Sequence, residues 1–290
     1  MEIQCKNKPL KTVFSQTNRF IPAGLEKIVI IPTYNEKENI AAILAAVFGL
    51  QKGFHVLVID DGSPDGTAQI VKDLQQQFTG QLFIEERKGK LGLGTAYIHG
   101  FKWSINRGYK YIFEMDADFS HNPNDLDRLY KACAIEGAGL AVGSRYVKGG
   151  GTINWTWDRK LLSKGASIYT QLITWIPVKD ATAGFVCYTR EVLEAINLDE
   201  IKFVGYAFQI EMKFATWKLG FKIKEVPILF QDRKLGNSKM HKGIIKEGVL
   251  GVLNLRWQSL FKNYRNRVKN AAEDGIFPSI NKEVYAKTRQ

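Results

Sequence analysis

Two aspartates, Asp116 and Asp118, stand one residue apart directly after the apolar run Tyr111–Met115. Residues i and i+2 of an extended chain lie on the same face, so the two carboxylates repel each other unless a cation lies between them. Mg²⁺ and Mn²⁺ prefer carboxylate and phosphate oxygens as ligands. The spacing therefore predicts a divalent metal at Asp116 and Asp118 that bridges to the diphosphate of a nucleotide.

Three more polar clusters follow apolar runs of the chain, at residues 33–36, 60–63 and 143–145. In an open parallel sheet, ligands bind outside the carboxyl ends of the strands, so we expect all four clusters to meet along one rim. Acidic side chains that lie there away from the phosphates suit the base and ribose of a nucleotide. Asp60 and Asp61 have a simpler alternative role, which is to cap a turn.

Short apolar runs alternate with helical patterns over residues 27–145, which predicts an α/β fold. The expected strands are Lys27–Pro32, His55–Ile59, Leu82–Ile84, Tyr111–Met115 and Leu140–Val142. The expected helices follow Asn35 or begin near Thr67, Thr95 and Asn124. This alternation predicts a mostly parallel, Rossmann-like sheet with helices on both faces and right-handed connections.

The pattern is looser after residue 145. Glycine-rich residues 148–152 are expected to form a mobile loop. Lys222–Phe230 is expected to be a strand, and Pro227 inside it favours a sheet edge or a bulge. Three helices are expected in this half of the chain, at residues 160–176, 191–196 and 208–219. The resulting division is an N-terminal extension at 1–26, a folded domain at 27–240 and a basic amphipathic extension at 241–290.

The charge of the chain points to anionic partners. The net charge is +12, whereas the apolar fraction of 45% and the charged fraction of 24% are ordinary for a globular protein. The three cysteines are scattered, which is typical of a reducing cytosol rather than a disulfide framework. Residues 1–26 do not resemble a secretory signal, and no run approaches the ~18 apolar residues that span a bilayer. We expect a cytoplasmic protein that is soluble or lies on a membrane.

Two common nucleotide motifs are not found in the sequence. There is no G-x-x-x-x-G-K-[ST] loop, and Gly92 and Gly94 lack the spacing of a dinucleotide site. Phosphoryl transfer from ATP and hydride transfer are therefore disfavoured. His121, a single histidine, is interpreted as a polar loop residue rather than a metal ligand.

Six motifs occur in a fixed order between about residues 27 and 240. They are PTYNE, IDDGSPDGT, KLGLGTAYIHG, DADFSHNP, GSRY and QDRKLGNSK. Together they resemble the polyprenol-phosphate (dolichyl-phosphate) mannose synthases, which are inverting glycosyltransferases of the GT-A fold. This resemblance implies metal-dependent transfer of mannose from GDP-mannose to a polyprenyl phosphate.

The resemblance also implies roles for individual residues. The implied donor-binding residues are Pro32, Tyr34, Glu36, Ile59, Asp61, Asp116, Ala117 and Asp118. The implied acceptor-phosphate residues are Arg145, Arg159, Arg233 and Lys239. Asp118, Arg145 and Arg233 would be the catalytic residues, and Asp116 and Asp118 would hold Mg²⁺ or Mn²⁺. A phosphate monoester has a second pKa of about 6 and is largely dianionic at pH 7, so we hypothesise that no general base is needed.

A basic amphipathic segment at Met240–Lys269 carries Trp257 and Phe261. Such a helix can lie in the interface of an anionic membrane, and residues 160–176 can do the same beside the lipid acceptor. We therefore expect peripheral association with the cytoplasmic face of a membrane, directly or through a membrane-anchoring partner. The alternative is that both helices pack on the core of the domain.

Two other functions remain open at this stage. The donor can be UDP-glucose or another sugar nucleotide with the same chemistry. A non-catalytic nucleotide- or nucleic-acid-binding protein would use clustered lysines and arginines with stacking aromatics, and it would not need carboxylates. The acidic rim argues against nucleic acid as a partner.

Overall fold

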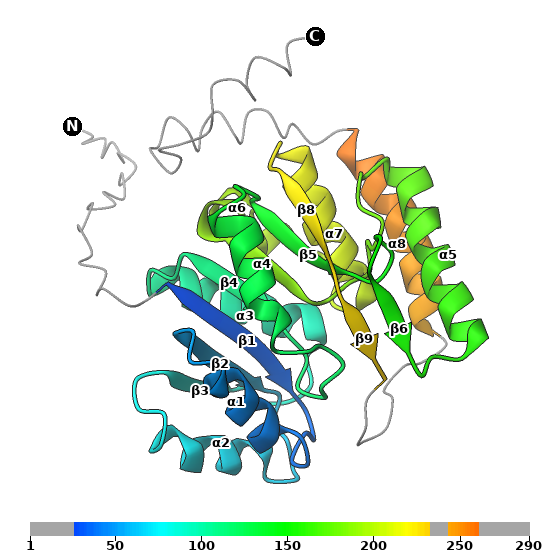
Figure 1. The fold of residues 1–290 in the computed structure, drawn as a ribbon. Coiled ribbons are helices and arrows are strands. Elements are labelled where there is room, and N and C mark those ends of the chain that lie inside the picture. The colour runs from blue at the N-terminus through cyan, green and yellow to red at the C-terminus, as the bar shows by residue number, and fades with distance from the viewer. Residues whose placement is uncertain (1–25, 233–242, 261–290) are drawn as a thin grey trace, which may run out of the picture.

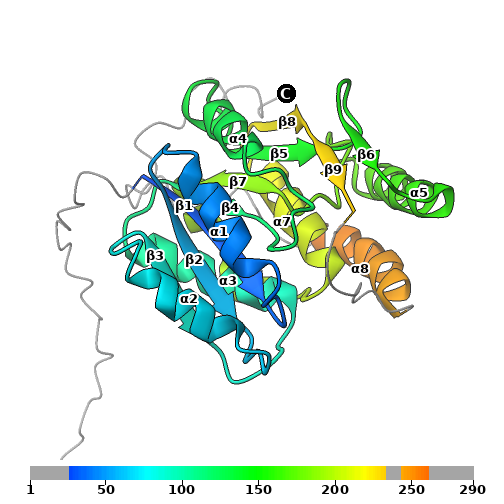
Figure 2. The ribbon, with the colours of Figure 1, turned by 60° about the horizontal axis from the view of Figure 1, so that its bottom comes forward.

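Seven strands form one mixed sheet that lies between helices, as Figures 1 and 2 show, in a computed structural model that describes residues 26–232 and 243–260. The strand order is β3-β2-β1-β4-β7-β5-β8. The strands are β1 (Lys27–Thr33), β2 (Phe54–Asp60), β3 (Leu82–Glu86), β4 (Tyr111–Glu114), β5 (Leu140–Ser144), β7 (Val186–Thr189) and β8 (Ile223–Pro227). All pairings are parallel except those of β7, so the mostly parallel sheet predicted from the sequence is confirmed.

Helices cover both faces of this sheet. The helices of the described residues are α1 (Ile40–Gly49), α2 (Thr67–Gln75), α3 (Leu93–Asn106), α4 (Asp125–Ala134), α5 (Trp157–Thr174), α6 (Arg190–Ala195), α7 (Tyr206–Lys218), α8 (Gly243–Ser259) and the 3₁₀ turn η1 (Leu198–Glu200). The side chains of strand β1 are buried on both faces of the sheet, which explains why its sequence is continuously apolar. Val29 and Ile31 pack with α1, α2 and α4 on one face, whereas Ile28 and Ile30 pack with α3, α6 and α7 on the other.

Strand β7 is antiparallel to both of its neighbours, β4 and β5, and was not predicted from the sequence. Phe113 pairs with Cys187, and Ala141 pairs with the same residue from the other side. The strand has only four residues, too few to show a clear apolar pattern of its own. A short strand of this kind is recognised by its partners rather than by its own periodicity.

A second, two-stranded parallel sheet joins β6 (Gly151–Ile153) and β9 (Leu229–Gln231). The expectation of a mobile loop at 148–152 is therefore wrong for its last two residues, because Gly151 donates its backbone N–H to the carbonyl of Ile228. The single strand expected at 222–230 is divided by a break at Ile228 into β8 and β9. The edge position that Pro227 predicted is confirmed, since β8 is the last strand of the large sheet.

Helices α5 and α8 lie side by side at one end of the molecule, next to α7 (Figure 1). A small apolar cluster joins them to the domain. It contains Ile176, Val178, Ala181, Ile210, Phe214, Val252 and Leu255. Helix α5 begins three residues before the predicted helix at 160–176, and the proposed boundary at 240 lies outside the described residues. Within residues 26–232 and 243–260, no helix is both long and apolar enough to cross a bilayer.

Candidate active site

The carboxyl ends of β1 and β2 lie in register, with Thr33 opposite Asp60. The Thr33 hydroxyl donates to Asp60 Oδ1 at 2.8 Å. The Asp60 carboxylate also accepts the backbone N–H of Ser63 at 2.8 Å and the Ser63 hydroxyl at 2.6 Å. The turn-capping role that we weighed for Asp60 is therefore confirmed.

Asp61 has a different partner, which is Arg87 at the start of the loop after β3. Arg87 Nε donates to Asp61 Oδ1 at 2.6 Å, and Arg87 Nη1 donates to the hydroxyl of Thr95 at 2.8 Å. The ion pair fixes the Asp61 carboxylate at the rim, and both side chains are largely buried. Sequence analysis missed Arg87. The available signal was an arginine three residues after the predicted strand Leu82–Ile84.

The other predicted donor-binding residues lie at the same edge. Tyr34 is half-buried, and the ammonium of Lys90 lies 5.3 Å from its ring centroid. The carboxylate of Glu36 accepts the side-chain amide of Asn39 at 3.0 Å. Ile59 is fully buried in the core, so the structure does not place it at the exposed rim.

Asp116 and Asp118 follow β4 in a short loop. The Asp116 side chain is 40% exposed, whereas Asp118 is buried and its Oδ1 accepts the backbone N–H of Ser120 at 3.0 Å. The backbone N–H of Asp116 donates to Nδ1 of His121 at 3.3 Å. The loop therefore holds one carboxylate at the surface and one behind it.

His121 lies in a loop, as interpreted from the sequence, and it is buried there. Its ring stacks on Phe185, with centroids 4.8 Å apart, and meets Phe230 edge-on at 5.3 Å. Burial lowers the pKa of His121 to about 4, which keeps the ring neutral and its Nδ1 able to accept the Asp116 N–H. His121 thus positions the loop that carries the two aspartates.

The carboxylates of this loop fit a divalent metal whose coordination shell is completed by the substrate. Among the described residues, no group of three histidine, cysteine or acidic side chains is arranged to hold a metal alone. Asp116 and Asp118 offer two carboxylates. Mg²⁺ typically takes one or two carboxylates and completes its shell with substrate phosphates and water, so this pair fits such an ion.

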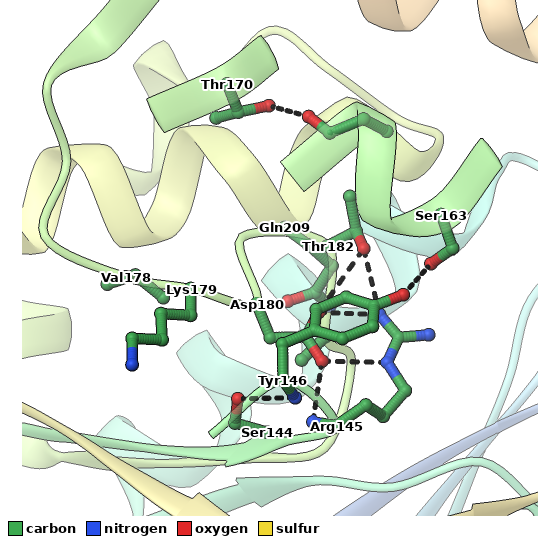
Figure 3. Close-up of polar contacts among 12 residues, drawn as sticks. Ser144, Arg145, Tyr146, Ser163, Thr170, Val178, Lys179, Asp180, Thr182 and Gln209 are labelled. Atoms are coloured by element: carbon green, nitrogen blue, oxygen red, sulfur yellow. Dashed lines mark hydrogen bonds and ion pairs between the residues drawn. The ribbon is translucent and has the colours of Figure 1, made fainter. Parts of the chain in front are cut away.

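Arg145 follows β5 and forms a bidentate ion pair with Asp180 (Figure 3). Its Nε and Nη2 lie 2.7 and 2.6 Å from the two Asp180 oxygens, and Nη2 also donates to the hydroxyl of Thr182 at 2.9 Å. Asp180 is fully buried, and its backbone N–H donates to the carboxylate of Glu225 at 3.0 Å. The Arg145 guanidinium is therefore fixed in one orientation, with Nη1 on the edge away from Asp180. Sequence analysis missed Asp180, which is 35 residues further along the chain.

Arg159, in the first turn of α5, lies in the same region as Arg145. Arg159 Nη1 lies 2.7 Å from Asp232 Oδ1. The guanidinium carbon of Arg159 lies 4.3 Å from the ring centroid of Trp155, and that of Arg145 lies 5.3 Å from the same centroid. The guanidinium carbon of Arg145 also lies 5.5 Å from the ring centroid of Phe230. The structure thus brings together two of the four predicted acceptor-phosphate residues; Arg233 and Lys239 lie outside the described residues.

We call Arg145, Arg159, Trp155 and Phe230 the arginine cluster. Phe230 connects it to the aspartate loop, because it contacts both His121 and Trp155. The backbone N–H of Gln231, the next residue, donates to the carbonyl of Ser120 at 3.2 Å. The acidic loop and the arginine cluster are therefore direct neighbours.

Comparison with known families decides the class of protein. The model of "Glycosyl transferase family 2" matches residues 28–196, more than half of the chain. The chain belongs to glycosyl transferase family 2. It is an enzyme of the glycosyltransferase type, as the six motifs predicted.

Two relatives of this family-2 glycosyltransferase are similar over most of its length. Polyprenol monophosphomannose synthase from Mycolicibacterium smegmatis is 45% identical over 225 residues, which cover 78% of this chain and 84% of the relative. Undecaprenyl-phosphate mannosyltransferase from Micrococcus luteus is 43% identical over 237 residues, covering 80% of this chain and 96% of the relative. The resemblance to polyprenol-phosphate mannose synthases is confirmed.

Solved structures of lower identity share the fold. Glucosyl-3-phosphoglycerate synthase from Mycobacterium tuberculosis, in complex with Mn²⁺, UDP-glucose and phosphoglyceric acid, has a TM-score of 0.58 at 15% identity and covers 81% of each chain. Mannosyl-3-phosphoglycerate synthase from Rubrobacter xylanophilus has a TM-score of 0.54 at 14% identity, covering 89% of this chain and 77% of that chain. The predicted GT-A architecture is confirmed.

In this family-2 glycosyltransferase, a buried polar network lies beneath the aspartate loop. Glu114, two residues before Asp116, accepts the side-chain amide of Gln209 from α7. Lys213 donates to Gln209 Oε1 at 3.2 Å and to the carbonyl of Ala183 at 2.6 Å. Burial raises the pKa of Glu114 and lowers that of Lys213, because both charges lie away from water. The network ties α7 to the strand that carries the aspartates.

Proposed function

We propose that this enzyme transfers mannose from GDP-mannose to a polyprenyl phosphate, with inversion at the anomeric carbon and release of GDP. The observation that carries the proposal is the contact between the aspartate loop and the arginine cluster. One region offers carboxylates for a metal and a diphosphate, and the other offers cations for a second phosphate. The names of the two relatives, both above 40% identity, support mannose and a polyprenyl phosphate as the transferred sugar and the acceptor.

On the donor side, we assign Asp116 and Asp118 to a Mg²⁺ or Mn²⁺ ion. When bound, this ion would offset the negative charge that grows on the GDP leaving group. Tyr34, Glu36 and Asp61 would contact the nucleotide, and Arg87 would hold the Asp61 carboxylate in place for it. Pro32, Ile59 and Ala117 would mainly determine the shape of the nucleotide site.

On the acceptor side, we assign Arg145 and Arg159 to the phosphate of the lipid. A guanidinium presents parallel N–H donors that match a phosphate. The dianionic phosphate oxygen attacks the anomeric carbon opposite the leaving diphosphate, and no proton has to be removed from it. Arg233 and Lys239 belong to this group by family resemblance alone.

The decisive assay offers the enzyme labelled GDP-mannose or UDP-glucose together with Mn²⁺ and farnesyl phosphate, a short polyprenyl phosphate. We expect label in the organic phase with GDP-mannose, and at least tenfold less with UDP-glucose. Free farnesol serves as the control acceptor, because it lacks the dianion and should stay unlabelled. Equal transfer from both donors would refute the assignment of guanine and mannose as the base and sugar of the donor. Transfer to farnesol would refute the assignment of the acceptor phosphate as the nucleophile.

Helix α5 carries its apolar residues on the outside. The exposed large side chains along it and at its end are Trp157, Leu161, Leu162, Ile168, Leu172 and Trp175. Three buried positions on the helix are polar instead, namely Ser167, Thr170 and Thr174. A helix that faces water normally shows the opposite arrangement. This reversal indicates that the outer face of α5 meets an apolar surface.

Helix α8 extends the same surface. Its exposed apolar residues are Val249, Leu250, Leu253 and Trp257, followed by Leu260. Two contacts join the helices. The Tyr169 hydroxyl donates to the carbonyl of Val249 at 3.0 Å. The guanidinium carbon of Arg256 lies 4.3 Å from the ring centroid of Trp175. Val252 and Leu255 pack inward, so α8 contacts the core with one side and exposes the other.

We propose that the outer faces of α5 and α8 lie in the interface of an anionic membrane on its cytoplasmic side, where the lipid acceptor is found. Wild-type protein should float with vesicles containing anionic lipid, and the double variant Leu161→Asp/Leu250→Asp should bind at least tenfold more weakly, because two apolar side chains leave the interface. Ile135→Asp is the matched control, since Ile135 is 73% exposed but lies after α4. A double variant that floats like the wild type would overturn the membrane assignment, and binding only after a membrane protein is added would favour an anchoring partner.

A further inference from the structure

The indole N–H of Trp155 is buried without a hydrogen-bond partner. The Trp155 side chain belongs to the arginine cluster, and the residue is only 8% exposed. Buried tryptophan N–H groups usually find an acceptor, because an unsatisfied buried donor costs free energy. An orphaned donor in this position therefore requires an explanation.

The neighbours of Trp155 explain why it lacks an acceptor. Indole and guanidinium groups only donate hydrogen bonds, so Trp155, Arg145 and Arg159 together present donors and no acceptor. The other orphaned side-chain atoms among the described residues are two tyrosine hydroxyls, a serine hydroxyl and a carboxylate oxygen, all of which can accept. Trp155 is thus the orphan that needs an anion or another acceptor from outside its own cluster.

The contacts of Arg159 show where such an anion fits. The Asp232 carboxylate lies 2.7 Å from Arg159 Nη1, and the Arg159 guanidinium lies over the Trp155 ring at 4.3 Å. The side chains of Arg159 and Asp232 are each about one-third exposed. An incoming anion can therefore separate this ion pair at a modest cost in free energy. An oxygen that replaces Asp232 would bind the same guanidinium that lies over the indole ring.

We propose that Trp155 is an acceptor-binding residue whose indole N–H donates to the phosphate of the acceptor lipid. The phosphate displaces Asp232 from Arg159 and takes the Trp155 N–H as a further donor. The ring of Trp155 also keeps the Arg159 guanidinium in place by contact with its face. This inference rests on the proposed function, because it assumes that the acceptor is a phosphate.

The test uses the Trp155→Phe variant, which removes the N–H and keeps an aromatic ring. We expect the KM for farnesyl phosphate to rise about tenfold or more, as for loss of a hydrogen bond to a charged group, while the KM for GDP-mannose stays within twofold. Trp217→Phe is the matched control, because that indole packs against Phe214 and Lys218 at the end of α7, outside the arginine cluster. It should leave both constants unchanged.

A second measurement reports binding without turnover. The chain has six tryptophans, so the ¹⁵N-labelled protein shows six indole N–H resonances, and the Trp155 signal is assigned from Trp155→Phe or by elimination with the other five variants. On addition of farnesyl phosphate, the Trp155 resonance should move downfield. An unmoved resonance and an unchanged KM in an active enzyme would overturn the inference alone. A wild-type enzyme that transfers nothing to farnesyl phosphate would overturn the proposed function and this assignment with it.

Discussion

Asp118→Asn should lower kcat by roughly 100- to 1,000-fold, because a metal that stabilises a leaving diphosphate contributes several kcal/mol to the transition state. Asparagine keeps an oxygen that can accept the Ser120 N–H, so the loop retains the bond that Asp118 makes at 3.0 Å. The change removes the negative charge and little else. Turnover of GDP-mannose is measured as a function of Mn²⁺ concentration, and metal binding in the presence of GDP is measured by calorimetry.

Asp127→Asn is the control for this substitution. Asp127 lies in the first turn of α4 and pairs with Lys131 at 2.9 Å, away from the aspartate loop. It should show the wild-type metal dependence. If Asp118→Asn retained both full turnover and the wild-type Mn²⁺ affinity, Asp118 would not be a metal ligand and the donor side of the proposal would be wrong.

Asp180→Ala should lower the free energy of unfolding by about 3–5 kcal/mol, because it leaves the guanidinium of Arg145 buried without its carboxylate. Arg145 is only 9% exposed and Asp180 is fully buried, so water cannot take over the lost contacts. The same change frees the guanidinium to rotate, and the KM for the acceptor should rise. Urea denaturation measures the first effect, and initial rates with farnesyl phosphate measure the second.

The double variant Asp180→Leu/Arg145→Met separates stability from binding. Removing both charges together should restore much of the stability that Asp180→Ala loses, since no unpaired charge remains buried. Acceptor use should stay impaired, because the phosphate has lost a guanidinium. A double variant with normal acceptor kinetics would show that Arg145 serves only the fold.

Much of the fold follows from short-range patterns in the chain. β1 and β2 are continuous apolar runs because helices cover both faces of the sheet, and such a run can be recognised without knowing its partners. The polar residues that follow these runs meet at one rim because parallel strands all end at the same edge. The pair Asp116 and Asp118 could be found in this way, since its chemistry depends on two neighbouring positions.

The partners of those residues could not be found in this way. Asp61 meets Arg87 across 26 positions of sequence, and Arg145 meets Asp180 across 35. An ion pair has no periodicity, and any of the 29 acidic residues could be paired with any of the 41 basic ones until the chain is folded. The outward-facing apolar side of α5 is a related case, because helical spacing predicts an amphipathic helix but does not say which face turns inward.

Local spacing in the chain was therefore enough to predict the parallel strands of the sheet, the acidic rim and the family resemblance, because each depends on residues close together in sequence. Packing between distant segments buried His121 against Phe185 and Phe230, brought two arginines to the ring of Trp155 and turned the apolar side of α5 outward. Those arrangements depend on which surfaces are buried against each other. Burial is a property of the folded chain, since it is set by neighbours that the local sequence does not contain.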